Sequence, residues 1–123
     1  MRPRVSLATV CLNCADAHEL GRFWSAFLGW PITRTEPHWV LLRDPEGHTG
    51  ISCQAEADYV PPVWPAAAGE PQMQMHLDLL VDDLEAAVAH AVACGARLAR
   101  WQPQAGVRVL IDPAGHPFCC FED

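Results

Sequence analysis

The residues best suited to chemistry are His76 and Asp78, which stand two positions apart in a stretch, Met73–Val81, that predicts a strand. Side chains two apart on a strand point to the same face, so the imidazole and the carboxylate can meet. A histidine beside a carboxylate can be tuned toward neutral pH, which general base catalysis requires. We therefore take His76 and Asp78 as the candidate catalytic pair.

The cysteines offer a second kind of chemistry. Cys11 and Cys14 have the CxxC spacing of redox and zinc motifs, but they lie on a predicted strand, where residues three apart point to opposite faces. Cys119 and Cys120 are adjacent on another predicted strand, so at least one of them should pack into the core. We interpret most of the six cysteines as small buried hydrophobes and not as a disulfide framework.

The composition indicates one ordinary globular domain of 123 residues, half of them hydrophobic. A net charge of -7 and the lack of any basic run argue against a nucleic-acid partner. No stretch approaches the roughly 20 apolar residues that span a bilayer. Because Met1–Arg4 is followed by a strand-like stretch and not by an apolar signal core, we expect a cytoplasmic protein without a membrane partner.

The same turn and helix-start residues also occur in both halves of the chain. The turn sequence Asp-Pro-x-Gly-His occurs at residues 44–48 and again at 112–116, an offset of 112 − 44 = 68. The acids Asp16 and Asp82 open two amphipathic stretches at an offset of 82 − 16 = 66. The two halves therefore carry the same features in the same order, which predicts a duplicated unit.

Each half reads as a strand, a helix and three further strands. Residues 56–72 separate the halves and are rich in proline and alanine, which is typical of a loop. In the first half we expect strands over Val5–Cys14, Ile32–Arg34, His38–Arg43 and Gly50–Gln54, with a helix from Asp16 to Gly29. In the second half we expect strands over Met73–Val81, Ala96–Trp101, Val107–Ile111 and Pro117–Phe121, with a helix from Asp82 to Cys94.

Three segments carry a resemblance to a known family: Cys14–Gly29, Met75–Leu84 and Asp112–Cys119. With them the chain resembles the vicinal oxygen chelate (VOC) superfamily of glyoxalase, bleomycin-resistance and dioxygenase proteins, and most of all the bacterial glyoxalase-like domain proteins. The resemblance implies an α+β fold of two tandem βαβββ units that form a cupped mixed sheet. Residues 1–123 would be one domain, with units at about 5–55 and 73–121.

The resemblance also implies where a metal would bind, because the superfamily's metal enzymes take one ligand from the first and one from the last strand of each unit. These positions fall on His76, on Thr9 within one residue (76 − 67 = 9), on Cys119, and on Ser52 or Gln54. Only His76 is a strong ligand, so we expect no cofactor. A divalent Zn, Ni or Fe ion on His76 stays as the alternative, as does a plain hydrogen bond from His76 to Gln54.

Aromatic residues suggest a binding role. Trp39 and Trp101 lie on or beside strands that should border the cup, and Trp64 interrupts the proline-rich loop, where it either faces a ligand or fastens the loop. The candidate ligand pocket consists of Thr9, Trp39, Gln54, Trp64, Trp101 and Cys119.

Three functions stay open. The first is metal-independent binding of a small organic ligand, aromatic compounds included. The second is a metal-dependent lyase, isomerase or dioxygenase that uses His76. The third is a regulatory or structural dimer, since the resemblance implies a homodimer in any case.

Overall fold

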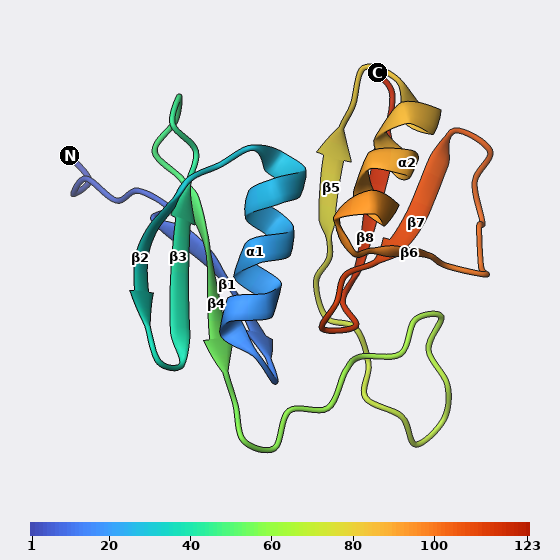
Figure 1. The fold of residues 1–123 in the computed structure, drawn as a ribbon, viewed down its shortest axis with the longest axis horizontal. Coiled ribbons are helices and arrows are strands. Elements are labelled where there is room, and N and C mark those ends of the chain that lie inside the picture. Colours follow the sequence, from blue (N-terminus) through green and yellow to red (C-terminus); the bar gives the residue numbers. More distant parts are fainter. The chain divides into compact units, whose positions relative to one another are not determined.

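The computed structural model describes all residues 1–123, which divide into two compact units, residues 1–59 and 60–123. Each unit holds one helix and one four-stranded mixed sheet, and its elements follow one another as strand, helix and three strands (Figure 1). The predicted α+β class and the duplicated βαβββ unit are therefore confirmed.

The two sheets share one topology. In the first the strand order is β1-β4-β3-β2 and in the second β5-β8-β7-β6, with the first and last strands of each unit parallel and the other neighbours antiparallel. The first unit consists of β1 (Thr9–Cys14), α1 (Ala17–Leu28), β2 (Ile32–Glu36), β3 (Trp39–Arg43) and β4 (Gly50–Ala55). The second consists of β5 (Leu77–Leu80), α2 (Leu84–Cys94), β6 (Arg97–Leu98), β7 (Val107–Ile111) and β8 (Pro117–Phe121).

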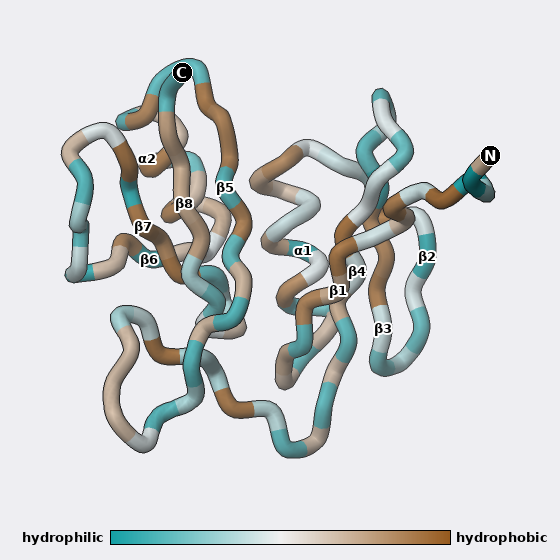
Figure 2. Tube along the Cα trace, turned by 180° about the vertical axis from the view of Figure 1, so that it is seen from behind, coloured by the Kyte–Doolittle hydropathy of each residue, from teal (hydrophilic) through white to brown (hydrophobic).

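The first helix begins and ends as its sequence predicts. The Asp16 side chain accepts hydrogen bonds from two free amides of the first turn, and Gly29 closes the helix with a φ of 74°. Gly21 lets the helix approach β3 closely, since a Cβ atom there would lie 2.6 Å from Val40 Cγ1. Apolar residues run along β3 and β7, each one of the two inner strands of its sheet (Figure 2). The helix face in the first core consists of Leu20, Phe23 and Trp24.

The second helix begins one residue later than predicted. Its N-cap is Asp83 and not Asp82, because Asp83 has the extended backbone of a cap and its side chain accepts from the amide of Ala86. The first amide of the helix, on Leu84, donates to the Glu122 carboxylate at 2.8 Å. The buried face is thin, as the small side chains of this helix predict.

The first strand is shorter than predicted at its N-terminal end. It begins at Thr9 and not at Val5, because Thr9 pairs with Gly50, the first residue of β4. The sheet offers no partner opposite residues 5–8, and Val5 and Leu7 stay exposed. An apolar, β-branched stretch is therefore not sufficient for a strand without a neighbour to pair with.

The fifth strand begins at Leu77 and not at Met73. Leu77 pairs with Phe118, one residue after Pro117, which opens β8 and has no amide to donate. As a result His76 lies immediately before the strand and not within it.

The sixth strand is reduced to Arg97–Leu98 instead of the predicted Ala96–Trp101. Beyond Leu98 one backbone bond remains, from the Ala99 N–H to the Val109 carbonyl at 3.0 Å. The Gln102 side chain supplies the rest: its Nε2 donates to the Val109 carbonyl at 2.8 Å, and its Oε1 accepts from the Val109 N–H at 2.9 Å. The backbone N–H and C=O groups of Val109 are therefore both hydrogen-bonded, although the sixth strand does not continue beyond Leu98.

Residues 56–72 form a loop, as predicted, held by an isolated bridge between Val63 and Gln72. Its beginning packs on the second Asp-Pro-x-Gly-His turn. Gly115 has a φ of +96°, and a Cβ atom there would lie 2.6 Å from Pro61. The glycine is thus required both by its backbone conformation and by this contact.

Candidate functional site

The predicted pair of His76 and Asp78 is brought together in the second unit. Asp78 Oδ1 lies 3.1 Å from His76 Nε2, which confirms that the two side chains share a face. The side chains are 29% and 59% exposed, so the pair is accessible from solvent.

Cys119 completes the cluster from the neighbouring strand. Its position in β8 is directly opposite Asp78 in the register, and the ligand atoms of His76, Asp78 and Cys119 all lie within 4.8 Å of one another. Burial raises the pKa of the Cys119 thiol, and Asp78 raises this pKa further by its charge and by accepting a hydrogen bond from the thiol. The thiol is therefore protonated at neutral pH and is a poor nucleophile.

Trp64 covers the imidazole of this cluster. The Trp64 and His76 rings stack with centroids 5.0 Å apart and an interplanar angle of 28°. Trp101 meets Trp64 edge-on, with centroids 4.9 Å apart. Trp64, which belongs to the proline-rich loop, therefore contacts the rest of the second unit through His76 and Trp101, and its facing a ligand stays a prediction.

Trp64 and the cluster of His76, Asp78 and Cys119 border a cavity of about 340 Å³ within the second unit. Trp101, expected in the ligand pocket, contacts Trp64 but does not line this cavity. The wall of the cavity is mainly apolar, and polar groups come from only a few side chains, which is the usual character of a small-molecule site. The cavity is lined by Trp64, His76, Asp78, Pro103, Gln104, Val107, Val109, Cys119 and Phe121.

Sequence reasoning missed five of these lining residues. Val107, Val109 and Phe121 alternate along the predicted strands on the same face as Cys119, so strand periodicity could have identified them. Pro103 and Gln104 carry no such signal, because they belong to a loop between strands.

The positions of the first unit that are equivalent to His76 and Cys119 carry hydroxyl groups instead of strong ligands. Thr9 stands seven residues before its cap Asp16 (16 − 9 = 7), as His76 does before Asp83 (83 − 76 = 7), so Thr9 is the counterpart of His76. Its hydroxyl is hydrogen-bonded to the Ser52 hydroxyl at 3.0 Å. Two neutral hydroxyl groups that satisfy each other are weak metal ligands.

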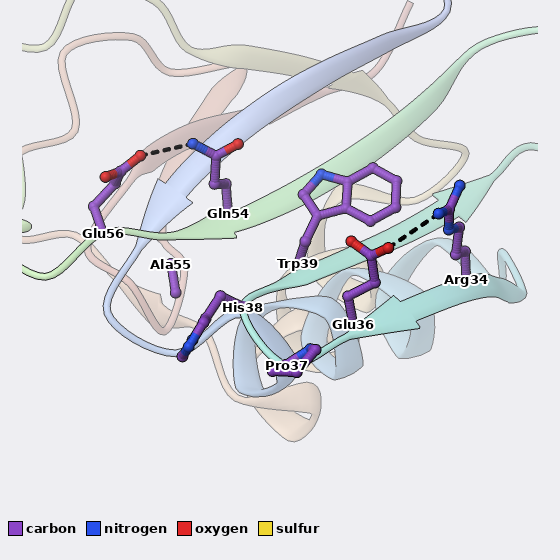
Figure 3. A pocket seen from close by; sticks show the side chains of 8 residues that line it. All are labelled: Arg34, Glu36, Pro37, His38, Trp39, Gln54, Ala55 and Glu56. Carbon is purple, nitrogen blue, oxygen red and sulfur yellow. Dashed lines mark hydrogen bonds and ion pairs between the residues drawn. The ribbon is translucent and has the colours of Figure 1, made fainter.

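Trp39 and Gln54 line a separate surface groove of the first unit, of about 590 Å³ (Figure 3). The guanidinium carbon of Arg34 lies 5.7 Å from the centroid of the Trp39 ring, a cation–π contact. Gln54, considered above as a partner for His76, donates instead to the Glu56 carboxylate at 2.7 Å. The sequence analysis did not anticipate Arg34 or Glu56, since isolated charges at strand ends usually face solvent.

The donor types of the second-unit cluster suit a divalent metal such as Zn²⁺, which binds imidazole nitrogen, thiolate sulfur and carboxylate oxygen. The raised pKa of Cys119 opposes this, because the thiol must lose its proton to bind a metal. The three residues therefore fit a metal by type and proximity but not by protonation state.

No helix of this chain combines the length and apolarity needed to cross a membrane.

No curated protein matches the sequence. Among solved structures, the chain is similar to a glyoxalase/bleomycin resistance protein/dioxygenase family enzyme from Burkholderia phytofirmans, with a TM-score of 0.71, 19% identity, and coverage of 96% of this chain and 98% of that one.

Two further structures share the fold. A glyoxalase family protein from Enterococcus faecalis gives a TM-score of 0.68 at 20% identity, covering 95% of this chain and 97% of that chain. TnmS3, an antibiotic binding protein from a Streptomyces species, gives a TM-score of 0.65 at 15% identity, covering 99% of this chain and 98% of that chain. The family model described as "Glyoxalase-like domain" matches residues 9–121. The chain therefore belongs to the glyoxalase-like domain family of the VOC superfamily.

Proposed function

We propose that this protein binds a small organic ligand in the cavity of its second unit, without a metal. The observation that carries the proposal is the aromatic wall: Trp64, from the proline-rich loop, stacks on His76 and borders an otherwise mainly apolar cavity. Flat organic compounds bind well to such surfaces, and a few polar groups orient them. The fold's occurrence in an antibiotic binding protein agrees with a binding role.

The metal-ligating atoms that the chain offers favour ligand binding without a metal. A metal site of the superfamily's kind would also draw on the first unit, where Thr9 and Ser52 offer only hydroxyl groups that bond to each other. In the second unit the Cys119 thiol holds its proton. Of the expected ligand positions, His76 alone is a strong ligand at neutral pH.

The proposal extends to the whole molecule. The two units would form one domain, residues 1–123, that works as a cytoplasmic homodimer. Trp39 and Gln54 would serve organic ligands in the groove of the first unit. Light scattering tests the dimer, and a species of 13.5 kDa would refute it.

Ligand binding is tested by calorimetry and thermal shift against a panel of aromatic metabolites and antibiotics. With a compound that binds, Trp64→Ala should weaken affinity about tenfold, since it removes both stacking area and the cover over His76. Trp30→Phe is the matched control, because Trp30 lies in the first unit and lines neither cavity. A flat response to the entire panel, or equal loss in both variants, would count against the proposal.

A second candidate, a metal-dependent lyase, isomerase or dioxygenase, is favoured by the donor atoms of His76, Asp78 and Cys119 within 4.8 Å. In such an enzyme His76 would bind the metal, or His76 and Asp78 would act as an acid–base pair. Dialysis after loading with Zn²⁺, Ni²⁺, Fe²⁺ or Co²⁺ decides between the two. Near-stoichiometric retention that His76→Ala abolishes would replace the metal-free proposal.

A further inference from the structure

The charge of the second-unit cavity restricts the class of ligand, provided that the cavity binds organic compounds as proposed above. We infer that its ligand is a flat organic cation, an aromatic ammonium or a protonated nitrogen heterocycle, whose N–H group faces Asp78. The inference depends on three features of the lining: its one carboxylate, its lack of a basic side chain of lysine or arginine, and its tryptophan wall.

Asp78 supplies the recognition group. Its carboxylate is the one acidic group that lines the cavity, and the side chain is 59% exposed, so a ligand can reach it. A carboxylate offers about four lone-pair positions, of which His76 and the Cys119 thiol use two. Asp78 can therefore accept a further hydrogen bond from a ligand N–H without losing its protein partners.

No lysine or arginine side chain lines this cavity. Arg108 is near in sequence but stands between Val107 and Val109, on the alternate face of β7. Its guanidinium donates to the carbonyls of Ala105 and Val107 at 2.8 and 3.0 Å. An anionic ligand would meet the Asp78 charge with no lysine or arginine to compensate it, and with His76 already engaged with Asp78, and it would lose its hydration as well.

The tryptophan wall favours the same charge. Trp64 lines the cavity, and an indole attracts cations more strongly than any other aromatic side chain. Because the Trp64 ring is already stacked on His76, a flat cation that donates to Asp78 would meet the indole beside the imidazole and not in its place. A neutral compound of the same shape would gain only the apolar contact.

Three compounds of nearly equal shape test the inference by calorimetry: 1-naphthylmethylammonium, 1-naphthalenemethanol and 1-naphthoate. The wild-type protein should bind the ammonium about tenfold more tightly than the alcohol, and the naphthoate most weakly. In Asp78→Asn, which keeps an acceptor for His76, the preference for the ammonium over the alcohol should disappear. Asp82→Asn removes the same charge from an exposed residue outside the cavity and should retain the preference.

Equal binding of ammonium and alcohol to the wild-type protein, or a preference that survives in Asp78→Asn, would overturn the inference and leave ligand binding intact. If Asp82→Asn also loses the preference for the ammonium, the preference comes from the net charge of -7 and not from Asp78, and the inference is likewise overturned. If none of the three compounds binds, the inference fails, whereas the proposed function is decided by the panel of aromatic metabolites and antibiotics. The wild-type ranking stands as a test by itself, even where a variant does not fold.

Discussion

The two units have the same topology but carry different side chains at the same strand positions. Where the second unit places His76 and Cys119, the first places Thr9 and Ser52, two hydroxyl groups 3.0 Å apart that satisfy each other. Strand pairing does not distinguish these sets, since each set lies on, or immediately before, the parallel pair formed by the first and last strands of its unit. The same fold therefore accommodates different side chains at these positions, so the site can differ between the units while the topology stays the same.

The third position of the cluster differs in the same way. Asp78 pairs with Cys119 in the second unit, and Cys11 pairs with Ser52 in the first. An exposed cysteine thus stands where the second unit has its carboxylate. The acidic recognition group proposed here is present in one copy of the duplicated unit only.

The two copies of the Asp-Pro-x-Gly-His turn also differ. Asp112 is buried, accepts from the amides of Ala114 and His116, and lies 2.8 Å from the His116 imidazole. Asp44 caps its turn with a side-chain bond from the amide of Glu46. The second turn has more hydrogen bonds to its aspartate, and this is the turn on which the proline-rich loop packs.

The largest expected difference in stability between the two units concerns their helices. Trp24→Ala should lower the free energy of unfolding by about 3–5 kcal/mol, because it removes a fully buried side chain from the first core. Leu84→Ala in the thinner core of the second unit should cost about 2 kcal/mol, at the low end for leucine. Urea unfolding measures both. Equal losses would show that the two helix faces contribute equally, against the difference in burial.

Removal of the turn aspartates should give unequal losses. Asp112→Ala leaves two amides and an imidazole without their acceptor and should cost about 3 kcal/mol, whereas Asp44→Ala should cost about 1 kcal/mol. Urea midpoints of the two variants measure the difference. A loss as large for Asp44→Ala as for Asp112→Ala would mean that burial does not separate the two turns.

The last strand of the second unit should make the protein sensitive to alkali. Burial raises the pKa of Cys120 to about 11, with a smaller contribution from the Cys119 charge. Above the ordinary pKa of 9.0 the unfolded thiol releases its proton while the folded thiol keeps it, so stability falls with rising pH. The loss should reach about 2 kcal/mol by pH 11.

Unfolding of the wild-type protein and of Cys120→Ala at pH 8, 9, 10 and 11 measures this effect. The variant should lose less stability than the wild type between pH 9 and 11, since the titrating group is gone. Parallel pH profiles of the two proteins would assign the alkaline loss to other groups.

The smallest expected effect concerns the hydroxyl pair of the first unit. Ser52→Ala should cost about 1 kcal/mol, because the Thr9 hydroxyl loses its partner at a partly buried position. In the double variant Thr9→Val with Ser52→Ala, part of this loss should return, since no polar group is left unsatisfied. A thermodynamic cycle of these variants measures the coupling. Additive losses would show that the bond contributes nothing.

The sequence by itself was sufficient to predict the duplicated βαβββ unit, and the reason is local. The cap Asp16, the closing Gly29 and the spacing of apolar residues between them specify a helix from contacts within a few residues. The spacing of two residues also predicted that His76 and Asp78 lie close together, although His76 stands just before β5 and not within it. The same reasoning did not find the ends of β1, β5 and β6, because a strand ends where its partner ends.

Only the tertiary structure decided what surrounds His76. The stacking of Trp64 on the imidazole depends on the path of a loop, and the place of Cys119 beside Asp78 depends on a register between strands that are about 40 residues apart in the sequence. Neither contact leaves a periodic signal, since each is set by the packing of distant segments. The fold was therefore predictable from local pattern. Trp64, His76, Asp78 and Cys119 could be named from the sequence, whereas their contacts with one another and the other five lining residues required the three-dimensional arrangement of the second unit.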